Sequence, residues 1–371
     1  EKALIVTHVR NHTFDFPKTE IIYSSHPFAT DKSQYAARKL IDFVEKINSN
    51  DLLIGLVSGG GSAMVTLPVD EVTMAEKSEY ISRILVAGIP EREANEIKKS
   101  LSKIKGGGLS SKSGSSQIIN LFLSDERNHK YEAIASGLLT EKKNTDPYAI
   151  IKEFSLESIT PSNILSIIKR RSSERVIASS KTIKNFLVGS RENLIENIME
   201  RASAFCFSEI FLLDNLSEIS PETAASYLSE SFNKFYDKAP AGMHLVISSG
   251  EIQVPVSNKK ISCHASTVWP KSAKGGRNQH LVAVMMERHS FKFPFCFIAY
   301  ATDGMDFLEG VTGAFYADYH LGMIKEKIKE IRNSISSNQA YEIHNAFNTL
   351  LKGGKTSNNV SDIYLFSFMK E

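Results

Sequence analysis

Residues 51–64 read DLLIGLVSGGGSAM, and the predicted organisation of the chain follows from this stretch. The apolar run from Leu52 to Val57 predicts a strand that is buried on both faces of its sheet. The next glycines, Gly59 to Gly61, have no Cβ, so their backbone can adopt positive φ angles and approach a ligand closely. Ser62 then opens a predicted helix, whose N-terminus favours anions. We predict either a site for phosphate or another anion here, or a tight turn without a ligand.

The bulk composition, with 42% hydrophobic and 23% charged residues, is typical of a soluble globular protein. A length of 371 residues predicts about two domains. The net charge is only +2, so no overall field attracts nucleic acid or an anionic membrane. The cysteines, Cys206, Cys263 and Cys296, form no C-x-x-C pair, which fits a reducing cytoplasm. No apolar run approaches the ~20 residues that a membrane span requires.

Short apolar runs alternate with segments of helical periodicity along the whole chain. This alternation predicts an α/β fold with mostly parallel sheets, whose ligands bind beyond the carboxyl ends of the strands. The boundary between two domains, 1–238 and 239–371, is placed near the sequence YDKAPAG at Tyr236–Gly242. The predicted strands are Ala3–Val6, Leu52–Val57, Ile118–Leu123, Phe186–Val188, Ile210–Leu213, Leu245–Ile247, Phe295–Ala301 and Ile363–Phe368.

The helices predicted between these strands follow from apolar residues at helical spacing. Lys103–Ser116, KIKGGGLSSKSGSS, has few apolar residues and is predicted to be an exposed, mobile loop or a plain linker. The predicted helices are Lys32–Ile47, Ala75–Ala87, Glu91–Lys103, Tyr148–Arg171, Arg191–Phe205, a helix after Gln279, Tyr319–Asn333 and Asn338–Leu351.

Several of the unusual residues fit phosphoryl transfer. That chemistry requires backbone donors around phosphates, cations where charge develops, and carboxylates for Mg²⁺. For each acid taken alone, helix capping or turn formation is an equally good explanation. The candidate donors are Gly59–Ser62 and Gly106–Gly108, the cations Lys105 and Arg277, and the metal ligands or base Asp125 and Asp303.

Three common site motifs are absent from the sequence. The glycines do not form G-x-x-x-x-G-K-[ST], so a Walker-type nucleotide site is not indicated. No G-x-G-x-x-G with a following acid is present, which argues against an NAD site of the usual design. Ser62 lacks the last glycine of the nucleophile elbow G-x-S-x-G. His264 and His280 are isolated and are expected to be structural or at the surface.

The chain resembles the ATP-dependent glycerate 2-kinases, the two-domain glycerate kinases whose C-terminal part is called MOFRL. The resemblance extends over nearly the whole chain and rests on many motifs in one order rather than on any one of them. These motifs are SHPFATD (Ser25–Asp31), LVSGGGSAM (Leu56–Met64), KKSLSKIKGGGLS (Lys98–Ser110), LFLSD (Leu121–Asp125), IASG (Ile134–Gly137), SSGEIQV (Ser248–Val254), KGGRNQH (Lys274–His280), ATDGMD (Ala301–Asp306), TGAF (Thr312–Phe315) and GGKTSNNVSD (Gly353–Asp362).

The resemblance implies a Rossmann-like N-terminal domain with a mostly parallel sheet, a smaller α/β C-terminal domain and an active site in the cleft between them. The implied reaction transfers the γ-phosphoryl group of ATP, with Mg²⁺, to the 2-hydroxyl of D-glycerate. The family's catalytic arginine corresponds to Arg277. Its lysine in an early G-K-A motif has no counterpart here, and we expect that segment to precede Glu1.

The residue-level hypothesis combines both lines of reasoning. Arg277, Asp303, Asp125 and Lys105 are the predicted catalytic residues, and Asp125 or Asp303 is the predicted Mg²⁺ ligand. The predicted ligand-binding residues are Ser58, Gly59, Gly60, Gly61, Ser62, Gly106, Gly107, Asn278, Glu251 and His26, although His26 is equally well explained as fixing the turn before Pro27. The ligand of the glycine turn is either ATP phosphate or the glycerate carboxylate.

The chain also departs from the family pattern. His129 replaces the second acid of the usual Asp-x-x-Gly-Asp, and Phe307 replaces the second glycine of ATDG-x-DG. A ligand-binding relative without activity therefore stays an alternative, as does a hydroxypyruvate reductase. The expected partners are D-glycerate and a nucleotide, without nucleic acid or membrane, and a homo-oligomer is compatible with the sequence.

Overall fold

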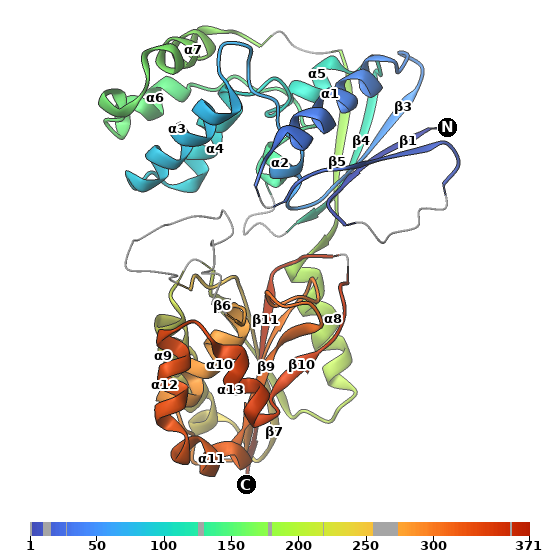
Figure 1. The fold of residues 1–371 in the computed structure, drawn as a ribbon. Coiled ribbons are helices and arrows are strands. Elements are labelled where there is room, and N and C mark those ends of the chain that lie inside the picture. Colours follow the sequence, from blue (N-terminus) through green and yellow to red (C-terminus); the bar gives the residue numbers. More distant parts are fainter. Residues whose placement is uncertain are drawn as a thin grey trace. The chain divides into compact units, whose positions relative to one another are not determined.

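The computed structural model describes residues 2–9, 16–26, 28–124, 130–176, 180–217, 219–254, 274–356 and 358–371. Among these residues the chain forms two compact units (Figure 1), and it passes from the first to the second between Val188 and Gly189. The predicted boundary at 238/239 lies inside the second unit, because helix α9 (Pro221–Lys238) contributes to that unit's core. Strand β6 (Glu209–Asn215) belongs to the same unit, since it pairs with β7 (Gly242–Ser249).

The first unit contains a mostly helical half and a half built on strands. Its elements are β1 (Ala3–Thr7), β2 (Thr19–Tyr23), α1 (Asp31–Glu45), β3 (Leu52–Val57), α2 (Gly61–Met64), α3 (Met74–Val86), α4 (Glu91–Ser100), α5 (Gly108–Lys112), β4 (Gln117–Ser124), the 3-10 turn η1 (Ile134–Ser136), α6 (Pro147–Glu153), η2 (Glu157–Ile159), α7 (Ser162–Ser173) and β5 (Thr182–Ser190).

The strands of the first unit form two sheets. β1 pairs with β2 in parallel, and β3 pairs with β4 in parallel, with Leu53 opposite Ile118. β5 lies on the other side of β4. Helices α1 and α5 cover one face of the β3–β4–β5 sheet (Figure 1), and Leu53 and Ile118 pack there against Val44 and Leu109. The predicted parallel pairing is confirmed for this unit.

The opposite face of this sheet is apolar and exposed. Along β3 the outward side chains Leu52, Ile54 and Leu56 are 48%, 56% and 77% exposed. On β5 the outward Phe186 and Val188 are exposed as well. The prediction that Leu52–Val57 is buried on both faces is therefore wrong, because the described helices that pack on this sheet cover only its other side.

The segment 103–116 is ordered and largely buried, so the predicted mobile loop is also wrong. Ile104 and Leu109 are 0% and 2% exposed and belong to the core under α1. Gly107 has a φ of +82° and lies so close to the backbone that a Cβ there would come within 2.5 Å of Lys142 N. The glycines of this segment serve close packing rather than mobility.

A single helix from Tyr148 to Arg171 is not formed. The segment divides into α6, η2 and α7, and Ser155, just past the end of α6, has a φ of +53°. Pro161 precedes α7 as its N-cap and lacks the N–H that a continuous helix requires. The residue before a proline also disfavours the helical region, and Thr160 is extended. Apolar residues of α6 and α7 nevertheless pack on α3 and α4 in one core.

The second unit is built around one six-stranded sheet in the order β10-β9-β8-β11-β7-β6. Among the described strands of this unit, only β6 and β7 pair in parallel, so the expectation of mostly parallel strands does not hold here. The elements not yet given are α8 (Arg191–Ser203), α10 (Arg277–Arg288), β8 (Phe295–Ala301), β9 (Val311–Ala317), η3 (Asp318–His320), α11 (Leu321–Glu326), α12 (Ile328–Ser336), α13 (Ala340–Phe347), β10 (Leu350–Lys352) and β11 (Asp362–Lys370).

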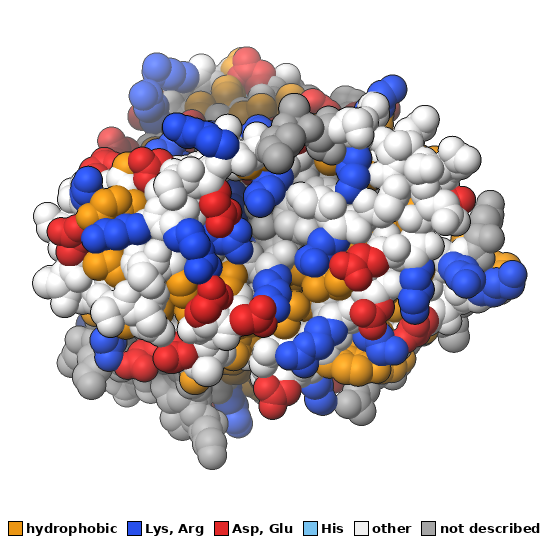
Figure 2. Space-filling model, turned by 90° about the horizontal axis from the view of Figure 1, so that it is seen from above, with side chains coloured by type: hydrophobic (Ala, Val, Ile, Leu, Met, Phe, Trp, Pro, Cys, Tyr) orange, Lys and Arg blue, Asp and Glu red, His pale blue; other side chains and the backbone are white. Residues whose placement is uncertain are grey.

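The described part of the face in Figure 2 shows no charge field of one sign. On the face in Figure 2, Lys and Arg side chains are interspersed with Asp and Glu. This mixture agrees with the net charge of +2. Within the described ranges, no helix has the length and apolar character needed to cross a membrane.

Candidate functional site

The glycine turn after β3 has the backbone that its sequence predicts. Gly60 has a φ of +77°, and its carbonyl accepts hydrogen bonds from Ala63 N (3.1 Å) and Met64 N (3.2 Å). A Cβ on Gly60 would come within 3.0 Å of His26 Nε2, and one on Gly61 within 2.9 Å of the Ala135 Cβ. The turn therefore requires glycine for close packing, independently of any ligand.

Lys105 lies directly against the residue that follows this turn. Its Nζ is 2.6 Å from Ser62 Oγ and 2.9 Å from Ser62 O. The lysine is only 7% exposed. Among the described residues, no carboxylate pairs with it, and burial followed by the charges of Lys77 and Lys98 lowers its pKa well below the usual value. The structure thus disfavours the charge that the prediction required of Lys105.

Two residues that the sequence did not single out extend this contact. Ser62 Oγ is 2.9 Å from Ser136 Oγ, which in turn donates to Asn95 Oδ1 at 2.9 Å. Ser136 is 2% exposed and has a φ of +57°. Its two chain neighbours, Ala135 and Gly137, are also left-handed. The I-A-S-G sequence signals a turn here, but Asn95 lies inside an ordinary helical pattern and offers no signal.

The backbone N–H groups predicted to hold phosphate in the second glycine turn are already bonded. Gly106 N donates to Ser136 O at 2.9 Å, and Gly107 N donates to Gly137 O at 2.7 Å. These bonds fasten the left-handed segment at Ser136 to the turn that carries Lys105. In the first turn, Ser58 is exposed, and its hydroxyl lies 3.4 Å from Gly59 O.

The second unit brings Arg277 together with two carboxylates. Arg277 is the first residue of α10, and its Nε donates to Asp362 Oδ2 at 2.5 Å. The same guanidinium lies 2.7 Å from Glu251 Oε1. Burial opposes the charge of Arg277, but Asp362 and Glu251 outweigh it and raise the pKa of the arginine. For Asp362, burial and the nearby Glu251 raise the pKa to about 7, with Arg277 opposing.

The carboxylate of Asp306 accepts hydrogen bonds from backbone N–H groups at the start of α10. Its Oδ1 accepts from Asn278 N at 3.1 Å, and its Oδ2 accepts from Gln279 N at 2.9 Å. A Cβ on Gly276 would come within 2.0 Å of Asp306 Oδ1, so only glycine permits this approach. Asn278 is fully buried, and its amide lies 3.4 Å from Asp306 Oδ1. Asn278 therefore packs inside the unit and stabilises the start of the helix, and it does not line an exposed site.

Models of two families match the chain. Residues 1–169 match the domain of unknown function DUF4147, and residues 244–362 match the MOFRL family. The chain belongs to the glycerate kinase family with a C-terminal MOFRL domain. The resemblance found in its motifs is thereby confirmed.

The names of similar proteins refer to two different activities, glycerate phosphorylation and hydroxypyruvate reduction. The glycerate 2-kinase of Picrophilus torridus is 26% identical over 98% of this chain and 80% of its own length. A putative hydroxypyruvate reductase of Agrobacterium vitis is 26% identical over 97% and 80%, respectively. The crystal structure of Thermotoga maritima glycerate kinase has a TM-score of 0.81 at 21% identity, and the match covers all of this chain and 85% of that one. The last comparison confirms the α/β fold.

Of the two acids in the family motifs, Asp125 and Asp303, the structure describes only Asp303. Asp125 lies outside the described residues. Asp303 is half-buried in the loop after β8, and its Oδ1 accepts from Met305 N at 2.9 Å. Burial raises the pKa of Asp303, while Arg277 lowers it and Glu251 raises it further. Asp303, Glu251, Asp362 and Arg277 thus form one charged cluster in the second unit.

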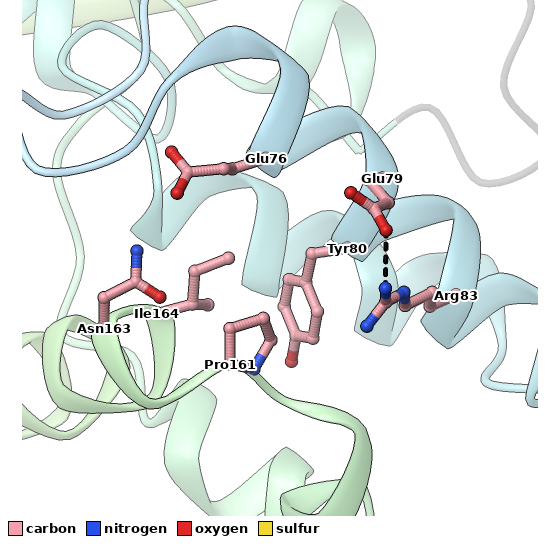
Figure 3. Close-up of a pocket in the computed structure, with 7 residues that line it drawn as sticks. All are labelled: Glu76, Glu79, Tyr80, Arg83, Pro161, Asn163 and Ile164. Atoms are coloured by element: carbon pink, nitrogen blue, oxygen red, sulfur yellow. Dashed lines mark hydrogen bonds and ion pairs between the residues drawn. The ribbon is translucent and has the colours of Figure 1, made fainter.

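A small cavity in the first unit involves none of the predicted glycerate kinase residues. It has a volume of about 60 Å³ and lies between α3 and the start of α7 (Figure 3). Arg83 pairs with Glu79 at its rim at 2.5 Å. The lining residues are Glu76, Glu79, Tyr80, Arg83, Pro161, Asn163 and Ile164.

Proposed function

We propose that this protein transfers the γ-phosphoryl group of ATP to the 2-hydroxyl of D-glycerate. The observation that carries the proposal is the pairing of Arg277 with Asp362 and Glu251 at the start of α10. A charged hydrogen bond on each side fixes the plane and direction of the guanidinium before any substrate arrives. Fixed cations of this kind stabilise the charge that develops on a transferring phosphoryl group.

The position of Arg277 also keeps it accessible. Its side chain is 34% exposed, whereas its partner Asp362 is 2% exposed. The buried carboxylate therefore holds the arginine from the inside of the unit. About a third of the arginine side chain therefore stays accessible to an anionic substrate.

The carboxylates of this cluster fit Mg²⁺ only if the substrate supplies most of the metal's oxygen ligands. Within the described residues, no three acidic, histidine or cysteine side chains are grouped to hold a metal by themselves. Mg²⁺ requires only one or two carboxylates when substrate phosphates supply the remaining oxygens. Asp303 fits that role, because Asp362 and Glu251 are engaged with Arg277. Asp303 would hold the metal there, which would supply positive charge beside the substrate phosphates.

The direct test is incubation with ATP, Mg²⁺ and D-glycerate, with the product identified by phosphorus and carbon NMR. We expect ADP formation that depends on glycerate, with phosphate on the second carbon. Phosphorylation of the third carbon would overturn the regiochemistry, and ADP formed without glycerate would identify hydrolysis instead. The matched control for a variant of Arg277 is the same change at Arg332, since Arg332 is an exposed arginine paired with Glu287.

A hydroxypyruvate reductase is the second candidate, because two similar proteins are named putative enzymes of that kind. The chain contains no G-x-G-x-x-G sequence for the dinucleotide. Oxidation of NADH by hydroxypyruvate, without ATP, would support the reductase. Calorimetric binding of ATP without turnover of any tested substrate would instead indicate a ligand-binding relative.

A further inference from the structure

The contact between Lys105 and Ser62 has a chemistry of its own. A serine hydroxyl is a weak nucleophile until a neighbouring base removes its proton. Lys105 Nζ lies 2.6 Å from Ser62 Oγ, which is within the reach of direct proton transfer. The sequence predicts Lys105 as a catalytic cation and Ser62 as a ligand-binding residue, and neither role explains their direct contact.

The surroundings of Lys105 favour the neutral amine, which is the form that acts as a base. The side chain is 7% exposed, and the charged groups that act on it are Lys77 of α3 and Lys98 of α4, both cations. No described carboxylate offsets its charge. Burial penalises the ammonium at such a place, which lowers the pKa of Lys105 and favours the neutral amine.

The second serine fixes the orientation of the first. Ser136 Oγ lies 2.9 Å from Ser62 Oγ and 2.9 Å from Asn95 Oδ1. Because Ser136 donates its one hydroxyl proton to Asn95 Oδ1, it can only accept from Ser62, and this contact holds the Ser62 oxygen beside Lys105. Ser136 occupies the left-handed region, which is strained for a non-glycine residue, and the bonds from Gly106 and Gly107 hold it there. Strain of this kind is concentrated at functional sites.

We propose that Ser62 is a nucleophilic serine, with Lys105 as its base and Ser136 as a positioning residue, and that it accepts the acyl group of small carboxylic esters. Ser62 is half-buried, whereas Lys105 and Ser136 are buried, so Ser62 is the most accessible residue of the group. This activity goes beyond phosphoryl transfer and does not depend on it.

The reaction is balanced by the residues present and water. The Ser62 Oγ bonds to the ester carbonyl carbon while its proton passes to Lys105 Nζ. The bond from that carbon to the ester's alcohol oxygen breaks, and the leaving alkoxide takes the proton from Lys105. Water then attacks the acyl-serine with Lys105 as base, giving the carboxylic acid and restoring Ser62.

The test uses the full chain with p-nitrophenyl acetate and with a small fluorophosphonate, followed by peptide mass spectrometry. We expect the fluorophosphonate on Ser62 and a release of p-nitrophenol that Ser62→Ala abolishes. Lys105→Met should lower the acylation rate by about a hundredfold. The matched controls are Ser82→Ala, an exposed serine of α3, and Lys112→Met, an exposed lysine of α5; both should react like the parent.

The pH profile separates a base from a structural lysine. In the parent, the acylation rate should rise with pH as Lys105 loses its proton, and this rise should disappear in Lys105→Met. Ser136→Ala should lower the rate about tenfold at every pH and leave the midpoint unchanged. Labelling of another residue, or no labelling of the folded parent, would overturn the proposal. Neither ATP nor glycerate is present, so this result is independent of the kinase assay.

Discussion

Arg277 and Asp362 form a charged hydrogen bond between the start of α10 and the start of β11, with Nε 2.5 Å from Oδ2. The second contact, from the other guanidinium nitrogen to Oδ1, is longer at 3.4 Å. Because Asp362 is 2% exposed, its charge depends on this arginine. Arg277 is therefore both the predicted catalytic cation and a residue that stabilises the fold of its unit.

Replacing Arg277 with Met should reduce both activity and stability. Loss of a fixed cation should lower phosphoryl transfer at least a hundredfold. It should also destabilise the protein by about 2–3 kcal/mol, because the buried Asp362 loses its partner. Urea unfolding and the coupled ADP assay measure the two effects on the same preparation.

The double variant Arg277→Met/Asp362→Asn separates these effects. Removing both charges should recover most of the lost stability, since no unpaired buried carboxylate remains. Activity should stay low, because the cation is still missing. A double variant as unstable as the single one would show that Asp362 does not depend on Arg277, and recovered activity would remove Arg277 from the mechanism.

The two faces of β3 provide a matched pair of leucines for a stability test. Leu53 is 7% exposed and packs under α1, whereas Leu56 is 77% exposed on the opposite face. Leu53→Ala should lower the free energy of unfolding by about 2–4 kcal/mol, and Leu56→Ala by less than about 0.5 kcal/mol. Denaturant titration of both variants measures the difference. An equal loss would mean that the outer face is covered in solution.

β3 also shows how far the sequence predicts this fold. An apolar run between turn residues was sufficient to place β1, β3, β4, β5, β6, β7, β8 and β11, whereas β2 was not predicted. The run alone cannot tell which face is covered, since that depends on helices far away in the chain. β9 and β10 were missed because one contains Gly313 among small residues and the other has only three residues.

Only part of the candidate site could be predicted, because its contacts also join residues that are far apart in the chain. Arg277 was identified from its motif, but its bond to Asp362 joins positions 85 residues apart and leaves no trace in local spacing. Lys105 was identified as a cation, although its burial and its two lysine neighbours disfavour the charge. Burial is a property of the packed unit, so residue type alone could not reveal it.

Phe307 occupies a backbone conformation that suits glycine. Its φ is +68°, and it stands where the family pattern has a glycine. Phe307→Gly and Phe307→Ala both remove the ring, but only the glycine variant removes the backbone strain. The glycine variant should therefore be about 1 kcal/mol more stable than the alanine variant, a difference of about 2–4 °C in melting temperature. Calorimetry that ranks alanine equal to or above glycine would contradict the strain.

Lys77 should make the stability of the protein depend on pH in the alkaline range. Its Nζ donates to Lys98 O at 3.1 Å and to Leu101 O at 2.9 Å. Burial, with the nearby charge of Lys98, lowers its pKa from 10.5 to about 7. Between these two values the unfolded chain binds a proton at this position that the folded chain lacks. The free energy of unfolding therefore rises with pH in this window.

Lys77→Met removes this contribution, so the variant should not gain stability as the parent does. Between pH 7 and pH 9, the parent should gain about 2–3 kcal/mol relative to the variant, at up to 1.36 kcal/mol per pH unit. Urea unfolding at several pH values measures this difference, and Lys112→Met, at an exposed lysine, should follow the parent. Lys105 also contributes a slope of the same sign, but both proteins retain it, so it cancels in the comparison. Parallel curves for parent and Lys77→Met would show that Lys77 remains charged in the folded protein.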